Sequence, residues 1–218
     1  MYLLAAFGAV IAAYLLGSIN FAVIFSKIFI KKDVRELGSG NAGMTNIMRA
    51  VGVLPGLLTF IFDALKGFAG CMVGKAVFEW LFAQTESTLF LAQYGVYICG
   101  LACMLGHVFP VFFRFKGGKG VAISVGIFAV CCPPAIIIGL VIFGVLLATV
   151  KVMSISSLSA TVVVVAGSIT VTLINPVGAL WPQILCALAM GFIVFIKHKD
   201  NIVRLARGEE KKFTVKKG

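Results

Sequence analysis

The sequence has few charged residues for its length. Aspartate, glutamate, lysine and arginine make up 12% of its 218 residues, whereas hydrophobic residues make up 61% and the mean hydropathy is +1.08. Soluble domains average about 25% charged residues, so this composition excludes an ordinary soluble enzyme and a disordered chain. Apolar runs of about 20 residues, enough to span a bilayer as a helix, recur along the chain. The sequence therefore predicts an all-α integral membrane protein.

The usual signals of a metal or redox site are also missing. None of the six cysteines has the paired C-x-x-C spacing of such a site, and all six fall within apolar stretches. We expect unreactive buried thiols and no bound metal. The first apolar run, residues 1–26, lacks the basic start of a signal peptide, so we expect it to be retained as the first helix.

Seven apolar segments predict a bundle of seven transmembrane helices in a single domain, residues 1–218. The segments are residues 2–26, 53–80, 88–113, 120–132, 134–150, 155–174 and 177–197. The pair Pro133-Pro134 separates the fourth segment from the fifth, because proline removes helix hydrogen-bond donors. The fourth segment would rise only about 20 Å against a hydrocarbon core of about 30 Å, so we expect this helix to be short.

Lysine and arginine are concentrated on one side of these seven segments. Seventeen of the 19 lie within residues 27–49, 114–119, 151 and 197–217, which follow the first, third, fifth and seventh segments. The positive-inside rule makes this side cytoplasmic, with the amino terminus outside and the carboxyl terminus in the cytoplasm. Six crossings would place the basic tail outside. Because the basic residues lie between apolar runs, membrane topology explains the net charge of +11 better than nucleic-acid binding does.

A glycine-rich segment, residues 38–49, lies on the predicted cytoplasmic side. Backbone amides in such segments converge on anions, and an arginine can bind phosphate through two hydrogen bonds. The candidate residues are Gly38, Ser39, Gly40, Asn41, Thr45 and Arg49. A flexible glycine loop is the simpler interpretation of this segment taken alone.

A second glycine-rich segment leads directly into the predicted short helix. Lys116, Gly117, Gly118 and Lys119 precede Gly120, where the free amides of a helix amino end attract anions. The spacing differs from that of a nucleotide-binding P-loop. A basic loop that follows the positive-inside rule explains the lysines but not the glycines. Either lysine fits a phosphate, and we prefer Lys119 because glycine flanks it on both sides.

Polar residues also occur near two further cytoplasmic boundaries. His198 and Asn201 follow the last segment and share one face if that helix continues. Serines of the 154–157 turn, Ser156 and Ser157 among them, can donate to a phosphate. A tail bound to anionic lipid is the simpler interpretation of the basic residues after Asn201.

Ionisable residues are rare within the apolar segments. Asp63 and Lys66 lie three residues apart in the second segment, where such groups are costly and usually paired. A structural ion pair and a functional role fit this pair equally well. His107, near the end of the third segment, fits a hydrogen-bonded core residue or a general base.

The motifs occur in an order that resembles the bacterial membrane acyltransferases that use acyl phosphate to acylate glycerol 3-phosphate. The matching residues are 38–41 with Arg49, 116–120, and 198–202 with Arg204, Gly208 and Glu209. The resemblance implies a seven-helix enzyme of the bacterial inner membrane whose active site faces the cytoplasm. It implies lysophosphatidic acid and phosphate as products, in the first acylation of phospholipid synthesis. No cofactor or obligate protein partner is implied.

The resemblance also implies roles for individual residues. Ser39, Asn41, Lys119 and His198 would be catalytic, and the substrate-binding residues would be Gly38, Gly40, Thr45, Arg49, Lys116, Gly117, Gly118, Ser156, Ser157, Asn201 and Glu209. The residues alone do not divide these groups between two phosphates. The hydroxyl proton has three candidate acceptors, namely the substrate phosphate, which we favour, His107 and His198.

Two other classes of function fit the sequence less well than an enzyme does. A small transporter or channel would place its polar site near the midplane, between structural repeats. Here the polar residues gather at one membrane face and no internal repeat is apparent. A membrane anchor with a basic tail would leave the glycine-rich segments unexplained.

Overall fold

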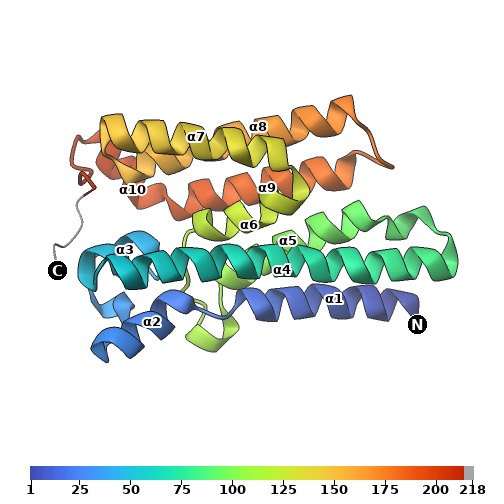
Figure 1. The fold of residues 1–218 in the computed structure, drawn as a ribbon, viewed down its shortest axis with the longest axis horizontal. Helices are drawn as coiled ribbons and strands as arrows, with labels where there is room; N and C mark the ends of the chain where they lie inside the picture. The colour runs from blue at the N-terminus through green and yellow to red at the C-terminus, as the bar shows by residue number, and fades with distance from the viewer. Residues whose placement is uncertain (214–218) are drawn as a thin grey trace.

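A computed structural model describes residues 1–213, which are helical and contain no strand (Figure 1). The helices are α1 (Tyr2–Gly17), α2 (Phe21–Ile30), α3 (Met44–Ala50), α4 (Val53–Thr85), α5 (Ala92–Val108), α6 (Val121–Cys131), α7 (Pro133–Val150), α8 (Met153–Ile174), α9 (Trp181–Lys197) and α10 (Lys199–Ala206). Three 3-10 turns join them: η1 (Val34–Glu36), η2 (Thr88–Phe90) and η3 (Val111–Phe113). Lys216 and Lys217 of the predicted basic tail lie outside the described residues.

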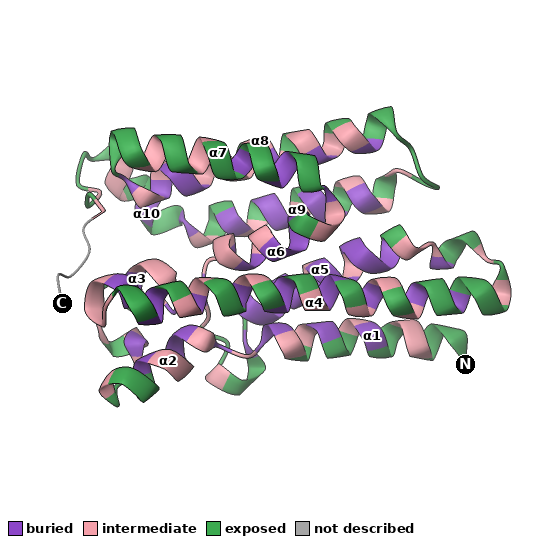
Figure 2. Cartoon of the chain, in the orientation of Figure 1, coloured by how far each residue is buried: buried purple, intermediate pink, exposed green. Residues whose placement is uncertain are grey.

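The helices form two groups with α6 between them. The first contains α1, α4 and α5, which run side by side and contact one another, and the second contains α7, α8 and α9 (Figure 1). Apolar side chains are exposed on the outer faces of α4 and α7, whereas buried residues lie between the helices (Figure 2). Such apolar outer faces suit contact with lipid.

The length of the helices bears on the number of membrane crossings. Among the described residues, five helical segments are long and apolar enough to cross a membrane, and the bent pair α9 and α10 makes a sixth. The remaining predicted segment, the fourth, corresponds to α6, which has only 11 residues. It follows that α6 is shorter than a full crossing, as its sequence suggested.

The first apolar segment is not a single helix, contrary to the prediction for residues 2–26. It breaks after Gly17, and α2 begins at Phe21. The side chain of Asn20 caps α2 by accepting a hydrogen bond from the Val23 amide at 3.2 Å. The Lys66 ammonium donates to the Ile19 carbonyl oxygen at 2.6 Å, so the break leaves this carbonyl satisfied.

The double proline ends α6 and begins α7, as predicted. The first positions of a helix make no use of their amide hydrogens, so proline is tolerated there. The close approach of α6 to α4 depends on glycine: a Cβ added to Gly126 would lie 1.8 Å from the Ala64 carbonyl oxygen.

The cysteines are all free; five are buried and Cys131 is half-buried, as expected for unreactive thiols.

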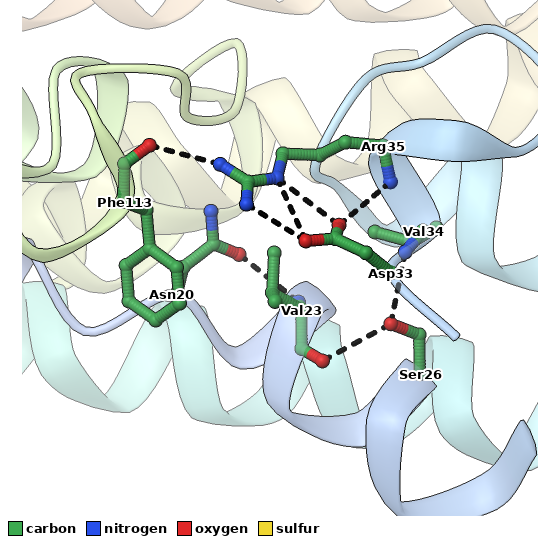
Figure 3. A network of polar contacts seen from close by, with 7 residues as sticks. All are labelled: Asn20, Val23, Ser26, Asp33, Val34, Arg35 and Phe113. Atoms are coloured by element: carbon green, nitrogen blue, oxygen red, sulfur yellow. Dashed lines mark hydrogen bonds and ion pairs between the residues drawn. The ribbon is translucent and has the colours of Figure 1, made fainter. Parts of the chain in front are cut away.

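A polar network joins the segment after α2 to the segment after α5 (Figure 3). The Arg35 guanidinium forms an ion pair with Asp33 at 2.7 Å and donates to the Phe113 carbonyl oxygen at 2.8 Å. The Ser26 hydroxyl accepts from the Val34 amide at 3.0 Å. These contacts fix the two glycine-rich segments at the same end of the molecule.

Candidate active site

A cavity of about 630 Å³ lies at the end of the bundle where the polar segments meet. Nine of the predicted site residues line it: Gly38, Ser39, Asn41, Thr45, Arg49, Lys119, Ser157, His198 and Asn201. They come from the segment before α3, from α3 itself, from the start of α6, from α8 and from the junction of α9 with α10. The fold thus brings together segments that are far apart in the sequence.

Six predicted site residues are outside this lining: Gly40, Lys116, Gly117, Gly118, Ser156 and Glu209. Gly117 and Gly118 instead allow their loop to lie on the end of α5. The Gly118 amide donates to the His107 carbonyl oxygen at 3.1 Å, and a Cβ on Gly117 would lie 2.0 Å from that oxygen. The Ser156 hydroxyl is buried and donates to the Val152 carbonyl oxygen within the first turn of α8.

The glycine-rich segment before α3 is shaped by a side chain that the sequence analysis did not single out. Asn46 is buried, and its carboxamide oxygen accepts from the Ser39 amide at 2.9 Å. Its nitrogen donates to the carbonyl oxygens of Val34, Leu37 and Asn41. A buried asparagine that bonds to four backbone groups holds this segment in one conformation.

The two candidate lysines of the second glycine-rich segment have different surroundings. Lys116 is exposed, whereas Lys119 lines the cavity and donates a hydrogen bond to the Oδ1 atom of Asn201. Burial lowers the pKa of Lys119 to about 8, while the nearby Glu210 carboxylate acts in the opposite direction. Of these two lysines, only Lys119 is therefore placed to meet a phosphate in this cavity.

The last helix does not continue straight: the chain bends by 58° between α9 and α10. His198 lies at the bend, and its Nδ1 atom is 2.8 Å from the Val194 carbonyl oxygen. A carbonyl only accepts hydrogen bonds, so Nδ1 carries the proton and Nε2 is left as the acceptor of the neutral ring. The bend brings both His198 and Asn201 to the cavity.

The carboxylate of Glu210 lines the cavity, whereas Glu209 is exposed. Glu210 accepts hydrogen bonds from Ser154 at 2.8 Å, from Asn201 at 2.6 Å and from Arg204 at 2.7 Å. Burial alone would raise the pKa of Glu210, but these hydrogen bonds lower it. The Gly208-Glu209-Glu210 sequence offered no means of choosing between the two glutamates.

Asp63, Lys66 and His107 form a buried cluster beside the cavity. The Asp63 carboxylate lies 2.8 Å from the Lys66 ammonium and 3.5 Å from Nδ1 of His107. Asp63 and His107 line the cavity, while Lys66 reaches the break between α1 and α2. The cluster therefore connects the break between α1 and α2 with the wall of the cavity. It supports the fold and also faces the site.

An apolar groove adjoins the polar cavity. The two share Phe60, Val121, Phe143 and Ser157, and the groove continues between α6, α7, α8 and α9. Its wall is almost entirely hydrocarbon, which suits an alkyl chain.

Within residues 1–213, no group of three or more histidine, cysteine, aspartate or glutamate side chains is arranged to hold a metal ion.

The fold and the cavity define a class of protein. It is a helical membrane protein whose site combines basic, hydroxyl and amide groups and lies beside an apolar groove. Such a site suits a phosphate-containing amphiphile. The family model described as glycerol-3-phosphate acyltransferase matches residues 7–208. The chain belongs to this family, and it is an integral membrane acyltransferase of phospholipid synthesis.

Relatives match over nearly the full chain. A glycerol-3-phosphate acyltransferase of Anaeromyxobacter dehalogenans is 39% identical over 203 residues, which cover 93% of this chain and 94% of that protein. Glycerol-3-phosphate acyltransferase 2 of Bacillus anthracis is 36% identical, with coverage of 93% and 96%. The crystal structure of PlsY, an integral membrane glycerol 3-phosphate acyltransferase in its glycerol 3-phosphate form, is 32% identical with a TM-score of 0.78 and covers 96% of both chains.

Proposed function

We propose that the protein transfers an acyl group from acyl phosphate to glycerol 3-phosphate, giving lysophosphatidic acid and phosphate. The observation that carries this proposal is the continuity of the polar cavity with the apolar groove. A substrate with a phosphate and an alkyl chain fits both parts at once. The solved PlsY structures, in glycerol 3-phosphate and lysophosphatidic acid forms, support the same pair of ligands.

The cavity offers groups for two phosphates. Ser39, Asn41 and Thr45, in the segment that follows Gly38, would bind the acyl phosphate through hydroxyls and amides. The phosphate of glycerol 3-phosphate would bind to Arg49, Lys119, Ser157, His198 and Asn201. We assign Lys116, Gly117, Gly118, Ser156 and Glu209 no contact with substrate, because they lie outside the cavity lining.

The chemistry requires positioning and neutralisation of charge. The glycerol hydroxyl oxygen attacks the acyl carbon, the bond from that carbon to the phosphate oxygen breaks, and the departing phosphate takes the hydroxyl proton. Two phosphates close together repel each other, so cations and backbone amides must offset their charge in the transition state. The catalytic roles of Ser39, Asn41, Lys119 and His198 follow from this requirement.

A direct test supplies the detergent-purified protein with palmitoyl phosphate and glycerol 3-phosphate and measures lysophosphatidic acid and released phosphate. We expect equal amounts of both products, and none when palmitoyl-coenzyme A replaces palmitoyl phosphate. Equal activity with the coenzyme A donor would overturn the proposed acyl donor. Uptake of a solute by vesicles without acyl transfer would favour a transporter instead.

The apolar groove gives a prediction for the acyl chain. Ala160 of α8 lines the groove, so Ala160→Phe should narrow it and lower kcat/KM for palmitoyl phosphate by about tenfold, with a smaller loss for a short-chain donor. Val162 of the same helix is exposed, so Val162→Phe is the matched control. An equal loss for long and short donors in Ala160→Phe would contradict the assignment of the groove.

We also propose seven crossings, with the amino terminus outside and the site facing the cytoplasm of a bacterial inner membrane. The concentration of lysine and arginine on one side of the seven segments supports this orientation. A reporter that is active only in the periplasm should be silent when it is fused after Gly218. A periplasmic signal from that fusion would overturn this topology.

A further inference from the structure

The chain returns to the cavity after α10. We call residues 208–213 the C-terminal strap. Two backbone contacts hold it: the Arg49 guanidinium donates to the Lys212 carbonyl oxygen at 3.3 Å, and the Phe213 amide donates to the Lys151 carbonyl oxygen at 2.6 Å. Glu210 and Lys211 of the strap line the cavity. The strap therefore delivers one carboxylate to a site that is otherwise rich in cations.

Both oxygens of that carboxylate accept hydrogen bonds. One oxygen of Glu210 accepts from Ser154 and Asn201, and the other accepts from Arg204. The Glu210 side chain is 10% exposed, so water competes little for these contacts. The three donors come from α8 and α10, and the carboxylate fixes them relative to one another.

The amide of Asn201 links this carboxylate to Lys119. An amide side chain has an accepting oxygen and a donating nitrogen, and a half-turn exchanges them. The Lys119 ammonium only donates and the Glu210 carboxylate only accepts, so together they allow one orientation, with Oδ1 toward Lys119. Without Glu210, the Asn201 amide is free to turn its nitrogen toward the ammonium.

We propose that Glu210 is a positioning residue for acyl transfer, which orients Asn201 and through it Lys119. This inference rests on the proposed function, because it assumes that Lys119 and Asn201 bind the phosphate of glycerol 3-phosphate. Glu210 does not touch substrate in this role. Its negative charge is tolerated beside a phosphate because Arg49, Arg204 and Lys211 line the same cavity.

The charge of Glu210 also favours the protonated form of Lys119. The charged groups that act on Lys119 are Glu210 of the strap, Arg204 and Asp200 of α10, and Arg49 of α3. Burial has already lowered the Lys119 pKa, so kcat/KM should fall as the pH rises through about 8 and the ammonium loses its proton. Loss of the Glu210 carboxylate should move this fall to lower pH.

The experiment compares Glu210→Ala and Glu210→Gln with Glu36→Gln, which removes the same charge from an exposed position in η1. Each variant is isolated as a monodisperse peak by size exclusion, and kcat and the KM for glycerol 3-phosphate are measured across pH. Glu210→Ala should raise KM by about tenfold or more, and the alkaline fall should begin about one pH unit earlier. Glu210→Gln retains an oxygen that can accept from Asn201, so it should recover part of the KM below pH 7 but keep the shifted profile.

Several results would overturn this inference. One is an unchanged alkaline profile in Glu210→Gln, together with a lower kcat that simply follows the amount of folded protein. Another is tighter binding of glycerol 3-phosphate, which would show that Glu210 competes with the phosphate. Should Glu210→Ala fail to fold, the pH profile of Glu210→Gln alone tests the proposal. If Glu210→Gln also fails to fold, Glu210 has a structural role and the proposal is overturned. An inactive wild-type protein would overturn the proposed function itself.

Discussion

Lys119→Ala should lower kcat/KM for acyl transfer by about a hundredfold to a thousandfold in the palmitoyl phosphate assay. The Lys119 ammonium is the cavity cation at the amino end of α6, where it adds to the field of the free helix amides. The adjacent glycines cannot neutralise two phosphates alone. Lys119→Arg should restore only part of the activity, because the planar guanidinium has a different reach and geometry.

Lys116→Ala is the matched control for this prediction. It removes one positive charge from the same loop, so topology and surface potential change equally in both variants. Lys116 is exposed and lies outside the cavity lining, so its replacement should change kcat/KM less than threefold, about 0.6 kcal/mol. An inactive Lys116→Ala beside a nearly normal Lys119→Ala would mean that the loop enters the site in another register.

Lys66→Met should cause the largest loss of stability among single charge removals. It leaves the Asp63 carboxylate buried without its partner at 2.8 Å and removes the donor to the Ile19 carbonyl oxygen. Breaking a buried ion pair in this way costs about 3–5 kcal/mol. Thermal unfolding in detergent, followed by the loss of the monodisperse peak, should show a large fall in midpoint or no folded protein.

The matched control lies in the same helix. Lys75 forms a looser pair with Glu79 at 3.8 Å, and these side chains are 44% and 54% exposed. Exposed pairs contribute about 0–1 kcal/mol, so Lys75→Met should leave the midpoint nearly unchanged. Equal midpoints for Lys66→Met and Lys75→Met would show that the buried cluster is not a structural requirement.

Much of the fold follows from the pattern of apolar residues. Each predicted apolar segment contains a helix, because a backbone surrounded by lipid must satisfy its own hydrogen bonds. The break between α1 and α2 was missed, because it depends on a donor that is distant in the sequence. Lys66 stabilises the Ile19 carbonyl from a helix 47 residues further along the chain.

The candidate site was predictable in outline and not in detail. The sequence indicated that Arg49, Lys119 and Asn201 belong to one anion site, because topology placed their segments at the same membrane face. It could not show that the chain bends after α9, or that the C-terminal strap returns to the cavity and places Glu210 rather than Glu209 in its lining. The supporting role of Asn46 was likewise invisible, because its backbone partners come from a folded loop.

The shortness of α6 has a consequence for how a lipid substrate would travel. Eleven residues rise only about 17 Å, so a helix of this length spans little more than half of a hydrocarbon core of about 30 Å. If its outer end lies near one membrane surface, Gly120 and the cavity lie below the opposite surface. A donor and a product with alkyl chains could then move sideways between the bilayer and the site. Only glycerol 3-phosphate and the released phosphate would have to cross the membrane–water boundary in each cycle.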